Sequence, residues 1–355
     1  MNFGLISELK KIPGPVMITG HTGFKGTWMT LFLESHGIPV VGFSLPPNEL
    51  SLYSRLNRKG EVFEKFGDIR LEDSVDKFIS DTKPSVIIHM AAQPLVLESY
   101  KDPIGTFSTN VMGTANLLNS ASKSNSVMVI GVVTTDKVYQ NINQGKQFIE
   151  SDPLGGKDPY SASKVGTEAV ISAWQQIAET NGGPTIISLR AGNVIGGGDW
   201  GENRLIPDLV RGFVTSTPLE IRNPQSTRPW QHVLDPLNGY LLALDYGLKH
   251  RKATAFNFGP IEPSLTVKEV IDIARQEWPM LLQPVAGVTN KNQESNYLDL
   301  NSNFAQEILG WNPVWPQIEA VQKSITWWRG YLVSKTSPQQ LCIGDIQEFT
   351  RALTL

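Results

Sequence analysis

The sequence contains one cysteine, Cys342, among its 355 residues, so no internal disulfide can form. A lone cysteine fits a reducing compartment. No apolar run approaches the roughly 20 residues that a helix needs to cross a bilayer. The first residues also lack the apolar stretch and small-residue cleavage site of a secretory signal. We therefore expect a cytoplasmic protein without a membrane partner.

The chain also lacks an excess of either positive or negative charge. The chain has 31 Lys and Arg residues against 34 Asp and Glu, with a formal net charge of −3. No basic block could neutralise the phosphates of a nucleic acid, so we expect no nucleic-acid partner, and we predict no metal site. A hydrophobic fraction of 40% suffices for a core, and the length favours one large and one smaller domain.

Short runs rich in Val and Ile alternate with longer amphipathic segments through the first half of the chain. The runs are residues 16–19, 38–45, 85–92, 127–134 and 185–190, and helical patterns lie near 24–36, 71–82, 106–123 and 160–181. Unbroken apolar strands between helices indicate a parallel sheet covered on both faces. The predicted fold class is therefore α/β, a doubly wound parallel (Rossmann) sheet.

The alternation ends after Arg190, where a loop with three consecutive glycines begins. We expect strands at 219–222 and 253–259, helices near 204–215, 264–278, 301–310 and 316–332, and an added helix in the tail 333–355. The predicted Rossmann domain is 1–190 with a returning segment near 232–260. Residues 191–231 and 261–355 would form a smaller mixed α/β substrate domain.

The first strand runs directly into TGHTGFKG, which places Gly20, Gly23 and Gly26 ahead of a helix from about Phe24. Glycines let the backbone approach a pyrophosphate, and the helix N-terminus presents free N–H groups to it. A glycine-rich turn that binds nothing is the alternative. The predicted dinucleotide-binding residues are Gly20, Thr22, Gly23, Phe24, Lys25, Gly26, Ser44, Asp68, Ile69, Ala91, Ala92 and Gln93, with Tyr160 and Lys164.

The second strand ends in Gly42-Phe43-Ser44-Leu45, without the carboxylate that usually holds the ribose of NAD. Ser44 could hydrogen-bond either ribose. Lys25 could favour a 2′-phosphate, although a solvated lysine is the plainer interpretation. We predict NAD as the cofactor and leave NADP open.

The segment PYSASK places Tyr160 and Lys164 four residues apart, on one face of a predicted helix. A free tyrosine has a pKa near 10. A nearby ammonium and a positive nicotinamide ring would both lower that pKa, so that the phenolate could take a proton from a sugar hydroxyl. Helices carry Tyr and Lys often, so this spacing alone is weak.

The segment TTDKVY follows the strand 127–134 and supplies Thr135, Asp136 and Lys137. Ligands of doubly wound folds bind beyond the carboxyl ends of the strands. Thr135 and the predicted acid and base Asp136 and Lys137 would therefore meet Tyr160 at one site. A plain polar turn is the alternative.

At this point the chain resembles the extended short-chain dehydrogenase/reductase family and, within it, the nucleotide-sugar 4,6-dehydratases that act on CDP-glucose. The resemblance runs from about residue 15 to residue 260 and weakly to about 328. It is carried by TGHTGFKGTW (19–28), AAQPLV (91–96), TNVMGT (109–114), TTDKVY (134–139), DPLGGKDPYSASK (152–164), RAGNVIGGGDW (190–200), NRLIPD (203–208) and RNPQSTRPWQHV (222–233).

The resemblance implies a hydro-lyase that converts CDP-D-glucose to CDP-4-keto-6-deoxy-D-glucose with bound NAD, in deoxysugar biosynthesis such as that of lipopolysaccharide O-antigen. Tyr160, helped by Thr135, would take the 4-hydroxyl proton. Asp136 would be the acid at the leaving 6-hydroxyl, and Lys137 would act at C5. A lysine base must be neutral, which requires burial or a neighbouring cation, so Lys137 could instead stabilise the enolate as a cation.

The resemblance also implies a homodimer through the helices near 106–123 and 160–181, and a set of groups around the nucleotide diphosphate. That substrate set is Asn193, Arg204, Leu205, Arg222, Arg228, Trp230 and His232. The loop IGGGDW would cover the substrate. The sequence departs from the family at Leu97, where the family usually has Arg. The identity of the substrate's nucleobase and sugar is therefore not decided by the resemblance.

Two rival functions remain at this point. A nucleotide-sugar 4-epimerase or ketoreductase would use the same Tyr and Lys but would need no acid and base for elimination, so Asp136 and Lys137 favour the dehydratase. A non-catalytic NAD-binding regulator is the other rival. Such proteins commonly lose the Tyr or the Lys, and both are present here.

Overall fold

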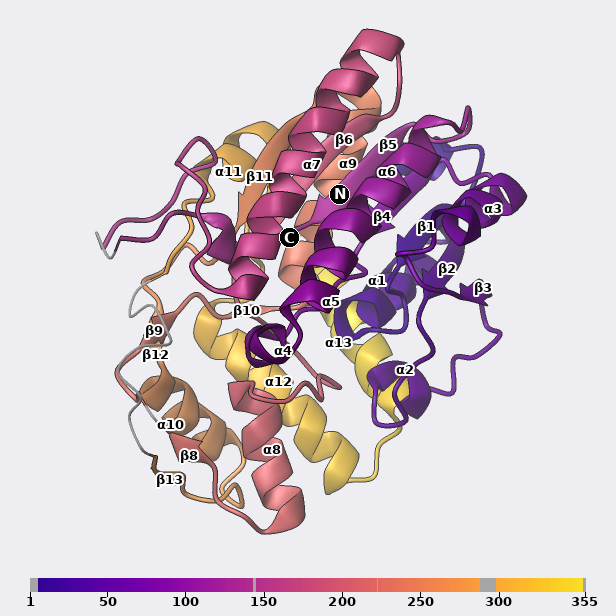
Figure 1. Ribbon diagram of the computed structural model, residues 1–355. Coiled ribbons are helices and arrows are strands. Elements are labelled where there is room, and N and C mark those ends of the chain that lie inside the picture. The colour runs from indigo at the N-terminus through magenta and orange to yellow at the C-terminus, as the bar shows by residue number, and fades with distance from the viewer. Residues whose placement is uncertain (1–5, 143–144, 222, 288–297, 354–355) are drawn as a thin grey trace.

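A seven-stranded parallel sheet forms the centre of the molecule, with strand order β11-β6-β5-β4-β1-β2-β3 (Figure 1). The computed structural model describes residues 6–142, 145–221, 223–287 and 298–353. The strands are β1 (Val16–Thr19), β2 (Val40–Ser44), β3 (Phe63–Phe66), β4 (Val86–His89), β5 (Val129–Val133), β6 (Thr185–Ala191) and β11 (Thr254–Phe258). The predicted doubly wound Rossmann fold is confirmed.

Helices cover both faces of this sheet and extend beyond its carboxyl edge. They are α1 (Phe24–Ser35), α2 (Leu52–Arg55), α3 (Glu72–Thr82), α4 (Val96–Lys101), α5 (Pro103–Phe107), α6 (Gly113–Ser122), α7 (Pro159–Asn181), α8 (Leu205–Thr215), α9 (Leu234–His250), α10 (Val267–Glu277), α11 (Asn303–Leu309), α12 (Gln317–Leu332) and α13 (Pro338–Ala352). Short turns are η2 (Leu9–Lys11), the π-helical η3 (Ser108–Met112) and η4 (Asp136–Val138).

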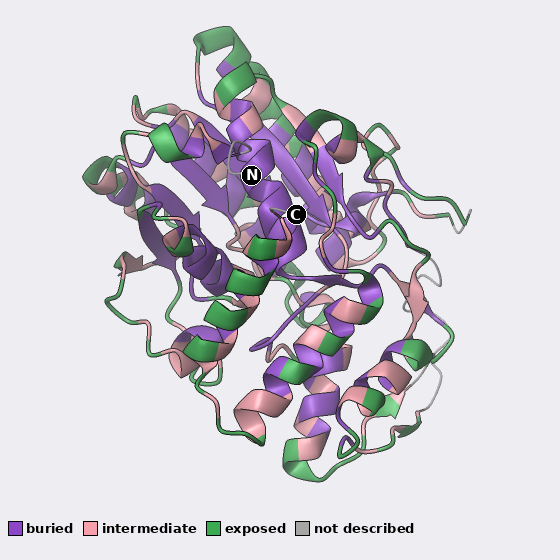
Figure 2. Ribbon diagram, turned by 180° about the vertical axis from the view of Figure 1, so that it is seen from behind, coloured by how far each residue is buried: buried purple, intermediate pink, exposed green. Residues whose placement is uncertain are grey.

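The two faces of the sheet belong to two separate hydrophobic cores. Val16 and Ile18 of β1 pack with α1 and α9, whereas Met17 between them packs with α3, α6 and α7. Side chains alternate between faces along a strand, so a strand with apolar residues at every position is buried on both sides. Figure 2 shows the resulting band of buried strands.

The chain returns to the sheet after a long excursion. Strand β11 pairs in parallel with β6, as expected for a segment near 232–260. Three small strand pairs accompany α8, α10 and α12 beyond the carboxyl edge (Figure 1): β7 (Val194–Ile195) with β10 (Gln231–His232), β9 (Thr227–Arg228) with β12 (Leu265–Thr266), and β8 (Glu220–Ile221) with β13 (Val285–Ala286). The domain boundaries themselves stay a prediction.

Two elements differ from expectation. The single helix expected at 106–123 is split into α5, η3 and α6, and Asn110 in the π-helical turn binds the Gln93 backbone and the Ser163 hydroxyl. The edge strand β3 was not predicted, because its sequence FEKF is short and has two charged residues at its centre. The tail helix was predicted correctly: α13 packs on α12 and α1.

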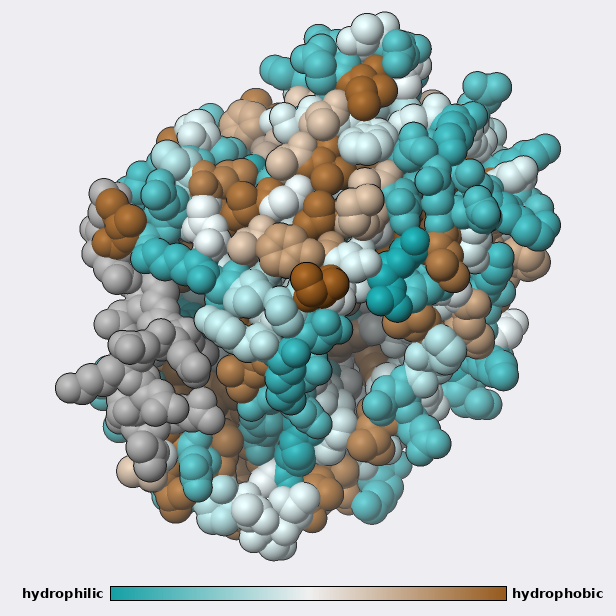
Figure 3. All heavy atoms as spheres, in the orientation of Figure 1, coloured by the Kyte–Doolittle hydropathy of each residue, from teal (hydrophilic) through white to brown (hydrophobic). Residues whose placement is uncertain are grey.

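Apolar side chains gather on the outer face over α5, α6 and α7 (Figure 3). Ile104 is 80% exposed, Met112 55% and Tyr100 51%. Apolar residues grouped in this way often mark a protein interface.

Candidate active site

The glycine segment between β1 and α1 forms a tight cradle. Gly20 has a φ of +76°, and a Cβ there would lie 2.8 Å from the backbone nitrogen of Ala91. A Cβ on Gly26 would lie 2.1 Å from the carbonyl oxygen of Gly20. Both positions therefore exclude any larger residue.

The start of α1 is open to an anion. Its N-cap is Gly23, and within the described residues no side chain caps the helix. The first amides of a helix need partners and form the positive end of its dipole. The cradle thus fits the pyrophosphate of a dinucleotide, as predicted.

The far end of the cradle is built by Thr22 and Ser44, whose hydroxyls lie 2.7 Å apart. The carboxylate of Asp68 is bound by Arg70, with an ion-pair distance of 2.6 Å, so it is already engaged. Ile69 is buried against Gly113. These residues supply hydroxyls and an apolar surface, which suit a ribose and an adenine, and they leave the choice between NAD and NADP open.

Lys25 is half-buried and extends toward α9, and its predicted role in binding the cofactor stays a prediction. Its ammonium lies 5.7 Å from the ring centre of Tyr240 on α9. It is close enough to feel the charges of Lys164, Arg204 and Asp136. The side chain therefore runs toward the catalytic residues, away from the adenine end of the cradle.

Thr135 connects Tyr160 and Asp136. Thr135 acts on the Tyr160 phenol and lowers its pKa against burial, and the Thr135 hydroxyl donates to Asp136 Oδ1 at 2.9 Å. Asp136 is 1% exposed, and its Oδ2 has no hydrogen-bond partner among the residues that the structure describes. A buried acceptor left free in this way is suited to a substrate hydroxyl. The predicted convergence of Thr135, Asp136 and Tyr160 is present.

The protein groups by themselves do not make Tyr160 acidic. Burial raises its pKa to about 12, while Thr135 and Arg204 act in the opposite direction. The ammonium of Lys164 donates to the carbonyl of Val133 at 3.1 Å, and its expected effect on the pKa of Tyr160 stays a prediction. Burial also lowers the pKa of Lys164 to about 8.

Lys137 sits at the edge of the same cluster. Its Nζ lies 3.6 Å from Asp136 Oδ1, and its side chain is 31% exposed. This position beside Asp136 is compatible with either predicted role, the base at C5 or a cation that stabilises the enolate, and the choice between them stays a prediction.

The predicted substrate residues divide into four groups, with His232 forming a group of its own. Arg204, the residue before α8, is bound by Asp199 at 3.0 Å and lies near Tyr160. Arg228 in β9, Asn193, Leu205 and Trp230 lie on the segments beyond the carboxyl edge of the sheet, and Trp230 is almost buried and donates to Leu265. Arg222 lies outside the described residues.

The structure removes His232 from the substrate set. Its ring is fully buried, with Trp28 at 6.0 Å and Trp315 at 4.5 Å between ring centres. Its Nδ1 accepts from the backbone of Leu234, and burial lowers its pKa to about 3. A neutral histidine enclosed by tryptophans is a core residue, so its assignment as a substrate donor was wrong.

The loop IGGGDW is packed against the core. Trp28 Nε1 donates to the carbonyl of Gly197 at 2.9 Å, and a Cβ on Gly197 would lie 2.0 Å from the ring of Trp327. Gly198 has a φ of +80° and rests on Leu52. The loop therefore holds Asp199, and through it Arg204, in a fixed place. That the loop covers the substrate stays a prediction.

Three residues near this cluster were not singled out from the sequence: Asp199, Glu168 and Tyr240. Glu168, four residues after Lys164, is buried and binds Arg190 at 2.9 Å, and its charge raises the pKa of Lys164. The spacing from Lys164 could have indicated Glu168. Nothing in the sequence places Tyr240 over Lys25, because α9 follows more than two hundred residues later.

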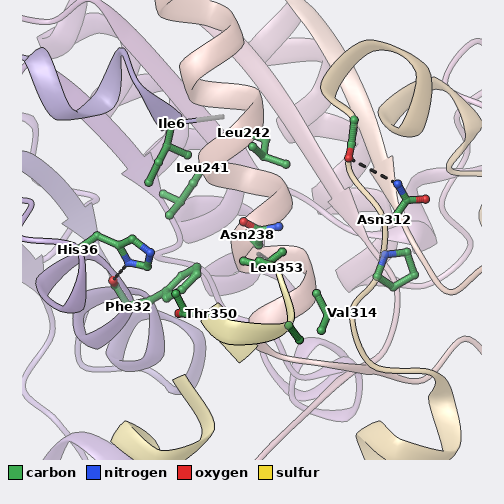
Figure 4. Close-up of a pocket in the computed structure, with 13 residues that line it drawn as sticks. Ile6, Phe32, His36, Asn238, Leu241, Leu242, Asn312, Val314, Thr350 and Leu353 are labelled. Atoms are coloured by element: carbon green, nitrogen blue, oxygen red, sulfur yellow. Dashed lines mark hydrogen bonds between the residues drawn. The ribbon is translucent and has the colours of Figure 1, made fainter. Parts of the chain in front are cut away.

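A cavity of about 380 Å³ lies elsewhere, between α1, α9 and the last turn of α13 (Figure 4). Phe32, Asn238, Leu241 and Leu353 are among its lining residues, and none of the predicted catalytic residues lines it. Within the described ranges, no group of three His, Cys, Asp or Glu is arranged to hold a metal. In the same ranges, no helix is long and apolar enough to cross a membrane.

The sequence matches the NAD dependent epimerase/dehydratase family over residues 16–259. The chain belongs to this family. A CDP-glucose 4,6-dehydratase of Salmonella typhimurium is 39% identical over 326 residues, covering 89% of this chain and 91% of the relative. Membership agrees with the cradle and with the Tyr160–Lys164 pair described above.

Solved structures of the family share the fold. A UDP-glucose 4-epimerase of Thermotoga maritima superposes with a TM-score of 0.77 at 22% identity, covering 90% of this chain and 99% of that one. A dTDP-glucose 4,6-dehydratase of Streptomyces venezuelae, with NAD bound, gives 0.76 at 23% identity, covering 91% and 100%. Because these identities are low, the superpositions support the fold alone.

Proposed function

We propose that this chain is a CDP-glucose 4,6-dehydratase that converts CDP-D-glucose to CDP-4-keto-6-deoxy-D-glucose with bound NAD. The observation that carries the proposal is the grouping of Thr135 and Asp136 near Tyr160, with a buried carboxylate oxygen of Asp136 that has no partner among the described residues. An epimerase or a ketoreductase has no need for an acid beside that phenol. The 39% identity to a CDP-glucose 4,6-dehydratase supports the same conclusion.

The cofactor would lie across the cradle, with its pyrophosphate at the start of α1 and its reactive ring toward Tyr160. When bound, NAD supplies the hydride acceptor and donor that make the overall reaction redox-neutral. Tyr160 would accept the proton of the 4-hydroxyl, and Thr135 would hold that phenol in place. Lys164, kept near Glu168, would bind the nicotinamide ribose.

The next step, elimination of water, would use Asp136 and Lys137. Asp136 would give a proton from its free oxygen to the departing 6-hydroxyl, which leaves as water, and Lys137, as the neutral amine, would take the proton lost from C5. Arg204 and Arg228 would hold the nucleotide diphosphate, with Arg222 outside the described residues as a further candidate.

The test is incubation of the purified protein with CDP-, dTDP-, UDP- and GDP-glucose, followed by mass spectrometry of the sugar nucleotides. Loss of one water from CDP-glucose, and from the others much more slowly, is expected. An isomer of unchanged mass would identify an epimerase instead. No reaction with any of the four, in a sample that binds NAD, would support a non-catalytic regulator.

We further propose a homodimer whose interface is the apolar face over α5, α6 and α7. Ile104, Phe107 and Met112 are exposed there, and α7 adds Ile177. We retain the cytoplasm as the proposed location, because the only cysteine is buried and unpaired, and deoxysugar biosynthesis, including that of O-antigen, as the proposed pathway class.

A further inference from the structure

Arg55, the last residue of α2, holds its guanidinium among three aromatic rings. Its Cζ lies 5.1 Å from the ring centre of Trp200, 5.2 Å from that of Tyr331 and 5.7 Å from that of Trp328. Its Nη1 donates to the Tyr331 hydroxyl at 3.0 Å, and its Nε donates to the carbonyl of Leu50 at 2.9 Å. Within the described ranges no carboxylate forms an ion pair with Arg55, so these three rings, the aromatic cage, are its main partners.

The aromatic cage brings together three segments that are remote in sequence. Helix α2 follows β2, which ends in Ser44 at the cofactor cradle. Trp200 is the last residue of the loop IGGGDW, and α12 supplies Trp328 and Tyr331. Trp200 also packs directly on Trp328, with 5.2 Å between ring centres. The cage therefore fixes the end of the loop to the helix that follows the second strand.

Trp200 is held by a second arginine as well. The Cζ of Arg211 on α8 lies 4.9 Å from the centre of the Trp200 ring, and its Nη2 donates to the carbonyl of Gly201 at 3.0 Å. The negative face of an indole favours such cations. Asp199, directly before Trp200, accepts from the backbone of Gly201 at 3.1 Å and pairs with Arg204 at 3.0 Å. The position of the indole therefore constrains where this ion pair lies.

We propose that Arg55 is a positioning residue for the sugar nucleotide, because it holds Trp200 and through it sets the Asp199–Arg204 ion pair beside Tyr160. This inference rests on the proposed function, in which Arg204 holds the diphosphate of the substrate. Arg55 contacts the cage and Leu50 rather than a catalytic residue, so its effect passes through Trp200. A planar guanidinium can stack on rings and donate hydrogen bonds in its own plane at the same time, which an ammonium cannot.

The test combines two measurements on the NAD-loaded protein. Titration calorimetry gives the dissociation constant of CDP, which carries the diphosphate and is not turned over, and steady-state kinetics give the KM for CDP-glucose. For Arg55→Met we expect both constants to rise by about tenfold, with NAD affinity unchanged. The rising limb of the pH–kcat profile should also move to higher pH, because Arg204 lowers the pKa of Tyr160. Arg55→Lys should recover part of the affinity, since an ammonium is still attracted to an aromatic face.

A double-mutant cycle separates positioning from general support of the fold. When Arg204 is already replaced by Met, adding Arg55→Met should weaken CDP binding no further, because the group that Arg55 positions is gone. Arg58→Met is the matched control. Arg58 lies three residues further along the chain and pairs with Glu34 of α1, outside the cage, so its loss should leave CDP affinity and KM unchanged.

Two results would overturn the inference while the original protein still dehydrates CDP-glucose. One is an unchanged affinity for CDP in Arg55→Met, and the other is a double variant in which the two losses add in full. If the original protein neither binds CDP nor turns over a sugar nucleotide, the proposed function fails, and the inference fails with it. Thermal unfolding shows whether Arg55→Met is folded. If it is not, Arg55→Gln takes its place, since glutamine keeps a donor at this position.

Discussion

Asp199 and Arg204 form an ion pair, 3.0 Å between Oδ2 and Nη1, that fixes a guanidinium beside the phenol of Tyr160. Arg204 lowers the pKa of Tyr160 against the larger effect of burial. Because the phenolate is the active base, activity rises as pH increases through that pKa. Arg204→Met should therefore shift the rising limb of the pH–kcat profile to higher pH, whereas Arg204→Lys should leave it nearly in place. A Met variant with only a raised KM would show that Arg204 acts on substrate binding alone.

Removal of the phenol should stop the reaction without unfolding the protein. Tyr160→Phe should lower kcat by at least about a hundredfold, the usual range for loss of a general base. Mass spectrometry of the product measures this, and thermal unfolding confirms the fold. Tyr246→Phe on α9 is the control, since its ring packs on His250 and Phe256 away from the catalytic residues. Full turnover by Tyr160→Phe would exclude the assigned role.

Lys137 should be required for elimination and not for oxidation at C4. With Lys137→Met we expect no loss of water, while the near-ultraviolet absorbance of reduced nicotinamide appears transiently after substrate is added. Stopped-flow absorbance and mass spectrometry on the same sample separate the two steps. Normal dehydration by this variant would show that Lys137 has no part in the chemistry.

Gly26 should be essential for the cofactor cradle. In Gly26→Ala the new methyl group meets the Gly20 carbonyl at 2.1 Å, so the cradle must shift, and we expect NAD affinity to fall by at least about tenfold. Gly344→Ala in α13 meets nothing within 4 Å and should instead raise stability by up to about 1 kcal/mol. Titration calorimetry and thermal unfolding of both variants provide the comparison.

Ile104 should contribute to self-association. It is 80% exposed on α5, so Ile104→Asp removes apolar surface from the proposed interface without disturbing a core. We expect a dimer for the original protein and a monomer for the variant in sedimentation velocity, with unchanged thermal unfolding at low concentration. Ile318→Asp on α12, where the residue is 51% exposed, is the control. A monomeric original protein would refute the interface.

Local sequence predicted the elements with strong hydrophobic patterns. The runs at 16–19 and 185–190 became β1 and β6, in which every residue is buried, as expected for strands covered on both faces. The edge strand β3 was not predicted, since none of its four residues is fully buried and its sequence lacks a hydrophobic run. The helix at 106–123 was read as continuous, and its π-helical turn follows from side-chain contacts of Asn110 with residues on other elements.

The sequence could predict those site residues that directly follow the carboxyl end of a strand. Thr135 and Asp136 follow β5 directly, so their convergence with Tyr160 could be expected from the fold class. The position of the Lys25 ammonium could not be predicted from the sequence, because it depends on four rotatable bonds and on the distant helix α9. His232 was misassigned for the same reason. Its neighbours Trp28 and Trp315 are remote in sequence, and only their packing makes it a core residue.

The hydrogen bond from Trp28 to Gly197 joins the two halves of the crevice through a single rigid helix. Helix α1 begins at the cofactor cradle and, one turn later, grips the loop that leads to Asp199 and Arg204. A substitution that displaces the start of α1 should therefore displace Asp199 and Arg204 as well, so damage to the coenzyme end would also reach the sugar-nucleotide end.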